Sequence, residues 1–390
     1  MSALLLWISL ALALTMVVVW WTLRCSETRP AAGPESPAPV LKGALQTTDA
    51  PSNQLLAAPA PPSMEPIPPE LASLNWRREA DLTPPQRATL LASMADITRP
   101  PGPLLQLLSA DFVARASTTE LSDLVMAEPL VAAKLLGQVN APLYGLRHPV
   151  TSIAQATALL GMDTVRSICV QYMLAQAFQP ASPTRQRVLD ILWRSSAIAS
   201  ELSIRLGKAL NLPDQGSLPT RAVLGFVGPV ATASLLPPDA LGQWLTHPPA
   251  QRAAREQAML GLSSGEIGGV LMASWKLPPT LIDEVCGASR LLGQPAEVAD
   301  PATAPRLGLS YLCARLGERL SSGQLTSLAA HDVLQEQAAD THYLRRYLSQ
   351  PTLHLRSYLG HPAADRLQAA LQSPALLAAV QRMLVPTPTA

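Results

Sequence analysis

Histidine is the side chain most suited to holding a catalytic metal ion or transferring a proton near neutral pH. This chain of 390 residues has six: His148, His247, His331, His342, His354 and His361. A metal ion that activates water needs imidazole and carboxylate ligands that converge, and only His331 is followed by an acidic residue, Asp332. No second His–Asp pair accompanies it, and Asp332 is better explained as the N-cap of a helix starting at Val333. We therefore predict no metal ion.

Other chemical motifs are incomplete in the same way. The glycines at 225–228 and 261–269 are not followed by the Gly-Lys-Ser/Thr of a phosphate-binding loop. Ser264 lies outside the Gly-x-Ser-x-Gly pattern of a serine nucleophile. The four cysteines lack the Cys-x-x-Cys spacing of a zinc or redox site. The residue types thus indicate no cofactor and argue against an enzyme.

Charge and composition narrow the possibilities further. The 29 basic and 28 acidic residues give a net charge of +1, which provides no general attraction to nucleic acid. Arg185, Arg187 and Arg194 are not interleaved with aromatic residues, so a solvated helix face explains them better than a nucleic-acid patch. Aromatic residues make up 4% of the chain and charged residues 15%, which suits helices. We predict an all-α fold and no nucleic-acid partner.

The stretch 119–178 shows the clearest helical patterns. Ser117 and Glu120 have capping-box spacing before a short helix. Pro129 suits the first turn of the next helix, where its missing N–H costs nothing. Ser152 and Gln155 form a second capping-box pair.

Two residues are expected to mark the junction between the last two helices of this stretch. Gly161 is placed for a left-handed C-cap, and Asp163 can cap the helix that follows it. The predicted buried stripe of that helix comprises Val165, Ile168, Cys169, Tyr172 and Ala175.

The same stretch resembles a known family. The runs that carry the resemblance are Glu-Pro-Leu-Val-Ala-Ala-Lys-Leu-Leu (128–136), Val-Asn-Ala-Pro-Leu-Tyr-Gly (139–145), Pro-Val-Thr-Ser-Ile-Ala-Gln-Ala (149–156) and Leu-Leu-Gly-Met-Asp-Thr-Val-Arg (159–166). Together they are similar to the signature of HDOD domains, helical bacterial modules related to the HD and HD-GYP phosphohydrolases. The resemblance implies an HDOD-type helical bundle and a role in regulating signalling, motility, stress or virulence.

The resemblance also indicates where a metal site would be. The positions that carry metal ligands in HD-type relatives fall on Ser195, Gly225, Phe226, Ser264 and Ala288, and none is a good ligand for a divalent metal. Between Trp193 and Arg290 the chain has one histidine, His247. We therefore predict a non-catalytic module that acts by binding a protein partner. The alternative is a diverged metal-dependent phosphohydrolase, or a phosphodiesterase or sensor of cyclic dinucleotides; no residue specifically supports a bound nucleotide.

One loop is a candidate interaction surface. Asn140, Tyr144 and Arg147 lie where helix packing alone does not require their types. Asn140 is explained equally well as a helix C-cap.

The N-terminal residues predict a membrane anchor. Residues 3–23 carry no charge and are long enough to cross a bilayer, with tryptophans at both ends. A cleaved signal peptide is the alternative, but no basic residue precedes the apolar run and no small-residue cleavage site follows it. Arg24 and Arg29 follow the span, which predicts a single-pass protein of the bacterial inner membrane with its C-terminal part in the cytoplasm.

The remaining organisation follows from proline content and helical spacing. Sixteen of the 38 prolines fall between Pro30 and Pro103, so residues 24–95 are predicted to be a largely disordered linker. A polyproline ligand for a partner is the alternative for this segment. Residues 96–320 are predicted to form the HDOD domain, and 321–390 a helical extension. Further helices are predicted over 82–97 with Thr83 as cap, 189–206, 221–236, 263–275 with a Ser263–Glu266 capping box, 281–288, 307–320, 329–348, and 364–384 with a break near Pro374.

Overall fold

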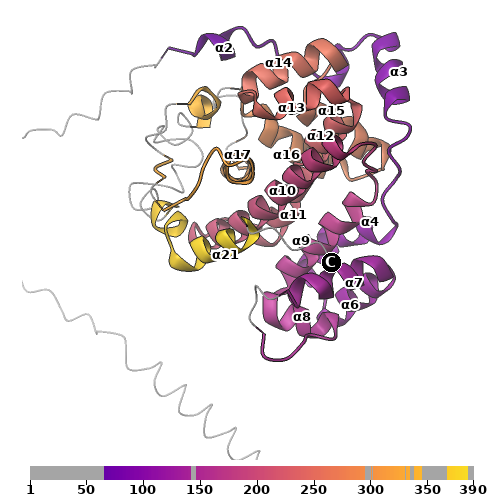
Figure 1. Cartoon of the computed structure of the whole chain (residues 1–390), viewed down its shortest axis with the longest axis vertical. Helices are drawn as coiled ribbons and strands as arrows, with labels where there is room; N and C mark the ends of the chain where they lie inside the picture. The colour runs from indigo at the N-terminus through magenta and orange to yellow at the C-terminus, as the bar shows by residue number, and fades with distance from the viewer. Residues whose placement is uncertain are drawn as a thin grey trace, which may run out of the picture. The chain divides into compact units, whose positions relative to one another are not determined.

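A helix of 27 residues, α10 (Pro183–Ala209), is the element on which the other helices assemble (Figure 1). Ser182 caps it by accepting a hydrogen bond from the backbone N–H of Arg185. Pro183 occupies its first position, where a missing N–H costs nothing. The helix predicted over 189–206 is confirmed and is longer at both ends.

The computed structural model describes residues 66–141, 146–294, 300, 302–329, 331–333, 338–344 and 367–384. All of them belong to one unit, Ala60–Ala390. Every regular element in these residues is a helix, which confirms the predicted all-α class. The predicted anchor at 3–23 lies outside the described residues. Within them, no helix is long and apolar enough to span a bilayer.

The resemblance to the family lies in a group of helices before α10. They are α4 (Pro103–Leu107), α5 (Ala110–Arg115), α6 (Thr118–Met126), α7 (Pro129–Val139), α8 (Ile153–Leu160) and α9 (Met162–Ala175). The predicted capping box of α6 is present, because the Ser117 N–H donates to Glu120 at 2.6 Å and the Glu120 N–H donates to Ser117 Oγ at 3.2 Å. Pro129 begins α7 as predicted. Ser152 caps α8, but the Gln155 side chain accepts from the neighbouring Thr151 N–H, so this box is only half formed.

The junction of α8 and α9 differs from the prediction. Gly161 has φ +86° and ψ 155°, a conformation that favours glycine but is not the left-handed helical one. Because α9 begins at Met162, Asp163 lies inside its first turn and does not cap it; its carboxylate instead lies 3.6 Å from Arg166 Nη2. Of the predicted stripe, Val165 and Cys169 are buried, whereas Ile168, Tyr172 and Ala175 are half-buried.

A second group of helices follows α10. It comprises α11 (Leu218–Leu224), α12 (Val227–Leu235), α13 (Pro238–Thr246), α14 (Pro249–Leu260), α15 (Ser264–Ser274), α16 (Pro279–Arg290) and α17 (Ala304–Ser321). The stretch 221–236, predicted as one helix, is interrupted at Gly225 and Phe226. Helices α12 and α15 cross with their backbones in contact: a Cβ atom added at Gly228 would lie 2.0 Å from the carbonyl oxygen of Ser264, and one at Gly268 would lie 2.8 Å from Gly228 Cα.

The C-terminal end of the predicted linker is folded. The helix predicted over 82–97 is confirmed as α3 (Pro84–Ser93), with Thr83 at its N-cap. Helix α2 (Pro69–Ala72) and the 3-10 turn η1 (Glu79–Asp81) also lie within the segment 24–95 that we predicted to be largely disordered. Leu71 and Leu90 are buried in the core. For residues 66–81 the structure therefore differs from the predicted disorder, because isolated apolar residues find partners on the domain that sequence periodicity does not reveal.

The helices after α17 pack on the domain. Helix α21 (Pro374–Leu384) packs against α10, and Pro374 begins it as predicted. The helix predicted over 329–348 is replaced, in the residues described there, by the short 3-10 turn η5 (Ala339–Thr341) and one further helical turn. The described part of the predicted extension 321–390 is thus continuous with the core.

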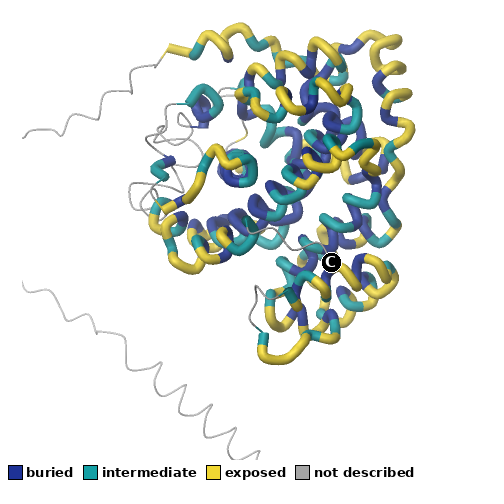
Figure 2. Tube along the Cα trace, viewed as in Figure 1, coloured by how far each residue is buried: buried dark blue, intermediate teal, exposed yellow. Residues whose placement is uncertain are grey.

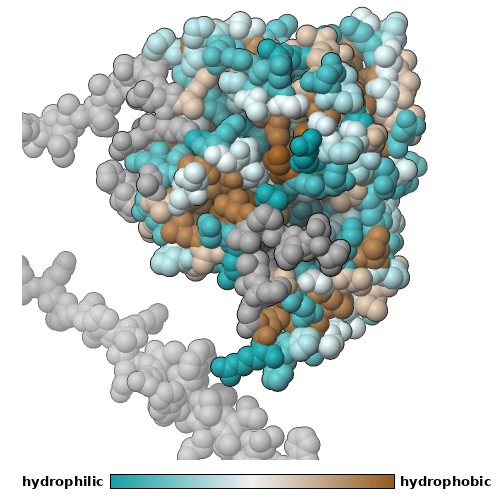
Figure 3. Space-filling view, in the orientation of Figure 1, coloured by the Kyte–Doolittle hydropathy of each residue, from teal (hydrophilic) through white to brown (hydrophobic). Residues whose placement is uncertain are grey.

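Burial follows the faces that these helices turn toward one another, and α10 is dark blue along much of its length in Figure 2. The outer surface in Figure 3 carries small hydrophobic patches separated by hydrophilic side chains. Among the large exposed apolar residues are Met126, Leu130 and Leu159, which belong to α6, α7 and α8.

Candidate functional site

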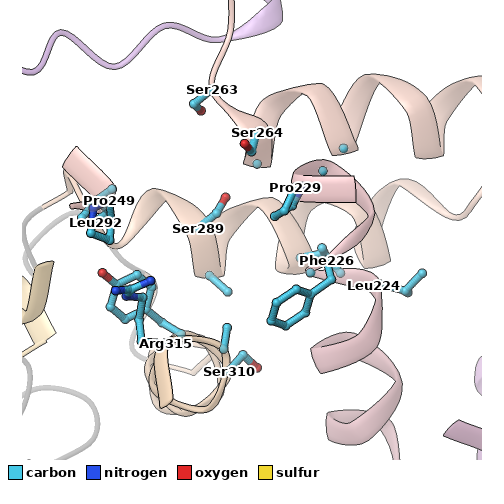
Figure 4. Close-up of a pocket in the computed structure, with 18 of the residues that line it drawn as sticks. Leu224, Phe226, Pro229, Pro249, Ser263, Ser264, Ser289, Leu292, Ser310 and Arg315 are labelled. Carbon is cyan, nitrogen blue, oxygen red and sulfur yellow. The ribbon is translucent and has the colours of Figure 1, made fainter. Parts of the chain in front are cut away.

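Four of the five predicted ligand positions line one cavity. Gly225 and Phe226 reach it from the junction of α11 and α12, Ser264 from the first turn of α15, and Ala288 from α16 (Figure 4). The cavity has a volume of about 130 Å³. The fifth position, Ser195 on α10, is not part of its lining. The structure therefore brings together most of what the resemblance had placed at a metal site.

Ser195 has a structural role instead. Its hydroxyl donates to the carbonyl oxygen of Ile191 at 2.8 Å. Its own carbonyl oxygen would lie 2.5 Å from a Cβ atom added at Gly317 of α17. The position thus marks the close crossing of α10 and α17.

A chain of buried ion pairs forms one wall of the cavity. Glu318 on α17 accepts hydrogen bonds from Arg252 on α14 and from Arg315 one turn earlier on α17. Arg315 also donates through Nε to Asp340 at 2.7 Å. Burial alone would raise the pKa of Glu318, but the two arginines outweigh it and hold that pKa below its usual range. Glu318 therefore remains ionised between two cations.

A second carboxylate, that of Glu256, lies beside these ion pairs, and its pKa is shifted in the opposite direction. Burial raises the pKa of Glu256 above its usual range, and Arg252, whose Nε lies 4.0 Å away, offsets only part of the effect. The carboxylate of Glu256 accepts hydrogen bonds from Trp244 Nε1 at 2.7 Å and from the backbone N–H of Ser264 at 2.6 Å. It thereby ties the start of α15 to α13 and α14.

A further ionic group contributes Arg221 and Glu284 to the cavity lining. Arg221 on α11 lies 2.5 Å from Glu284 and 3.0 Å from Asp214. Arg306 also reaches Glu284, at 3.1 Å. All three arginines that line the cavity are thus paired with carboxylates.

The start of α15 corrects one prediction. The expected Ser263–Glu266 capping box is absent, because Glu266 instead makes a two-point ion pair with Arg290 at 2.6 and 3.0 Å. Glu266 also accepts a hydrogen bond from Trp76 Nε1 at 3.1 Å. The hydroxyl of Ser263 is buried and has no hydrogen-bond partner.

The residues of the cavity do not fit a metal ion. The four predicted ligand positions that line it supply only a glycine and phenyl, hydroxyl and methyl groups, and its carboxylates are paired with arginines. Within the part of the chain that the structure describes, no group of three or more His, Cys, Asp or Glu side chains could hold a metal. We therefore derive no reaction step through a metal at this site.

The histidines are dispersed. His148 is exposed in the loop after α7, His247 follows the end of α13, and His342 is buried with its ring 5.1 Å from that of Tyr343. His354 and His361 lie outside the described residues. The helix proposed to start at Val333 also continues outside them, so the N-cap interpretation of Asp332 stays a prediction.

The candidate interaction loop is fixed at its two ends by Asn140. The Asn140 amide donates to the carbonyl oxygens of Leu136 at 2.9 Å and Val150 at 2.7 Å, and its oxygen accepts from the Val150 N–H at 2.7 Å. Arg147 is exposed in this loop. Tyr144 lies outside the described residues. Asn140 thus positions the loop, in addition to ending α7.

Sequence reasoning did not identify the ionic wall. Arg252 and Glu318 lie on different helices and far apart in the chain, so no spacing rule connects them. The only available signals were the i,i+4 pair Arg252–Glu256 and the i,i+3 pair Arg315–Glu318, which are common on solvated helix faces.

Comparisons with known proteins agree with the fold and the sequence signature. The sequence profile of the HDOD domain matches residues 99–289. A solved structure from Marinobacter aquaeolei VT8, of a protein proposed to act in signal transduction, is 18% identical with a TM-score of 0.50, covering 80% of this chain and 68% of that one. No curated protein has significant sequence similarity to the chain.

Two further structures are similar at lower TM-scores. An HDOD domain protein of unknown function from Geobacter sulfurreducens is 15% identical with a TM-score of 0.48, covering 74% of this chain and 97% of that one. A protein from Shewanella amazonensis SB2B, proposed to be a phosphohydrolase, is 18% identical with a TM-score of 0.46, covering 76% and 98%.

The fold is that of an all-helical module built around one long central helix. The profile match, together with the signature described above, identifies residues 99–289 as an HDOD domain.

Proposed function

We propose that this chain is a membrane-tethered, non-catalytic HDOD module that regulates a signalling pathway by binding a protein partner. One observation supports this most. Four of the five positions where HD-type relatives would hold a metal line a single cavity, and none of the five carries an imidazole or carboxylate. The acidic side chains around them are neutralised by arginines. An arrangement of this kind lacks the ligands with which a metal-dependent hydrolase activates water.

The surface proposed for the partner is the loop between α7 and α8. The double hydrogen bond between Asn140 and Val150 holds the two ends of this loop together. Exposed residues on a loop that is held by a rigid frame are well placed to recognise a partner. Arg147 and Tyr144 are the side chains that we assign to this contact.

The tether is the apolar run 3–23, with the domain on the cytoplasmic side of the inner membrane. The absence of charge over this run and the arginines that follow it support the assignment. Proline-rich chain after the span would keep the domain at a distance from the bilayer.

The absence of catalysis is tested with the purified full-length chain in detergent. We expect no stoichiometric Mn²⁺ or Fe²⁺ by elemental analysis, and no hydrolysis of bis-p-nitrophenyl phosphate or cyclic di-GMP above the rate in buffer. Turnover that depends on a bound metal would refute the proposal in favour of a phosphohydrolase.

The partner surface is tested by site-specific crosslinking in the bacterial host. A photocrosslinker at position 147 or at position 144 should each give a discrete crosslinked protein. Arg147→Glu should abolish the product formed from position 144. Arg255→Glu, an equally exposed arginine on α14, is the matched control and should leave it unchanged. Equal loss with both charge reversals would exclude this loop as the specific surface.

A further inference from the structure

The size of the cavity limits what it can hold. Its volume is about 130 Å³, close to that of an engineered protein cavity of roughly 150 Å³ that binds benzene. A molecule with one ring therefore fills it. A cyclic dinucleotide, with two bases, two sugars and two phosphates, does not fit inside.

The walls combine apolar surface with one unsatisfied hydroxyl. Phe226, Pro229, Met272, Val285 and Leu292 contribute apolar side chains. Ser263 is 2% exposed, and its Oγ atom lacks a hydrogen-bond partner. In Figure 4 Ser263 lies next to the start of α15, above Pro229 and Ser289. Buried hydroxyls are normally paired, so this one indicates a place for a polar atom of a ligand.

The charges of the cavity indicate that this ligand is neutral. Three arginines and three glutamates line it, Arg221, Arg252, Arg315, Glu256, Glu284 and Glu318. Each arginine is already within ion-pair distance of a carboxylate. The backbone N–H of Ser264 is likewise bonded to Glu256. A phosphate would thus meet donors that are already used and carboxylates that repel it.

From these three observations we infer that this cavity of the HDOD domain is a binding site for a neutral molecule with a single ring and one hydroxyl or carbonyl group. The ring lies against Phe226 and its apolar neighbours, and the polar group pairs with Ser263. This inference goes beyond the proposed partner binding and stands or falls independently of it.

The test uses ¹⁹F NMR with the full-length chain in detergent and 4-fluorophenol as the probe. We expect saturable binding that Ala288→Leu, which fills the cavity, weakens at least tenfold; binding to the micelle is the same for both proteins and cancels. Circular dichroism confirms that the variant is folded. Equal binding to the two proteins would overturn the inference.

The polar contact is tested with a smaller change. Ser263→Ala should weaken 4-fluorophenol several-fold and leave fluorobenzene unchanged, because fluorobenzene has no group to pair with the hydroxyl. Ser274→Ala, an exposed serine at the other end of α15, is the control and should affect neither probe. Tighter binding of 4-fluorophenyl phosphate than of 4-fluorophenol would overturn the assignment of a neutral ligand, as would a Ser263→Ala variant that binds 4-fluorophenol normally.

Discussion

Glu318 pairs with two largely buried arginines at once. Its side chain is 11% exposed, and those of Arg252 and Arg315 are 12% and 13% exposed. Removing one member of a buried ionic group leaves the others uncompensated, which costs far more than the group contributes when intact. The residue therefore has an importance for stability that its sequence neighbours do not reveal.

We expect Glu318→Gln to lower the free energy of unfolding by about 3–5 kcal/mol, measured by urea denaturation. The control is Asp111→Asn, which breaks an ion pair with Arg115 between side chains that are 75% and 80% exposed. That change should cost less than about 1 kcal/mol. Similar small losses in both variants would show that the buried group is not structurally important.

Glu256 and Glu318, two of the three glutamates that line the cavity, should respond to pH in opposite directions. Because the pKa of Glu318 is lowered from 4.5, its contribution to stability is complete above that pH and is lost as the pH falls through the folded-state value. The pKa of Glu256 is raised from 4.5, so its contribution is complete below that pH and is lost as the pH rises through the folded-state value.

Melting temperatures between pH 3.5 and 8 test this. The deficit of Glu318→Gln relative to the unmodified chain should shrink in acid. Glu256→Gln should instead improve relative to the unmodified chain as the pH rises. Parallel curves for the two variants would contradict the assignment.

Between elements, glycine determines how closely helices approach. Gly228 and Gly268 bring the backbones of α12 and α15 into contact, and this crossing places Phe226 and Ser264 on the same cavity. We expect Gly228→Ala to destabilise the protein by about 1–3 kcal/mol or more through overpacking. Thermal denaturation measures the loss.

Gly137 on α7 is the matched control. Its position is exposed, and a Cβ atom added there meets nothing within 4 Å. Gly137→Ala should stabilise the chain by about 0.5–1 kcal/mol, because glycine is a poor helix former. A loss of stability in this variant would mean that the two glycines do not differ as described.

The sequence predicted well those elements that are determined locally. The capping box of Ser117 and the proline starts of α7 and α21 need only neighbouring residues. It did not predict that Glu266 would pair with Arg290 and Trp76 instead of forming a capping box with Ser263, because those partners are brought close only by tertiary contacts. Four of the residues that line the cavity could be identified from the family resemblance, whereas the ion pairs of its wall could be identified only from the folded structure.

For the whole molecule, the segment before the HDOD match is part of the folded unit. Leu71, Leu82, Leu90 and Met94 are buried in the core. A chain beginning at residue 66 should keep the melting temperature of the folded unit, whereas one beginning at residue 96 should melt about 10 °C lower because these side chains lose their burial. Equal melting temperatures would show that 66–95 contributes nothing to stability.

The attachment of this segment has a mechanical consequence. After Leu71, which is buried in the core, this segment is bonded to the domain at Trp76, which donates to Glu266 of α15, and at the Arg77 N–H, which donates to Gln257 of α14. Tension along the chain would therefore act on α14 and α15, the two helices that supply Arg252 and Ser264.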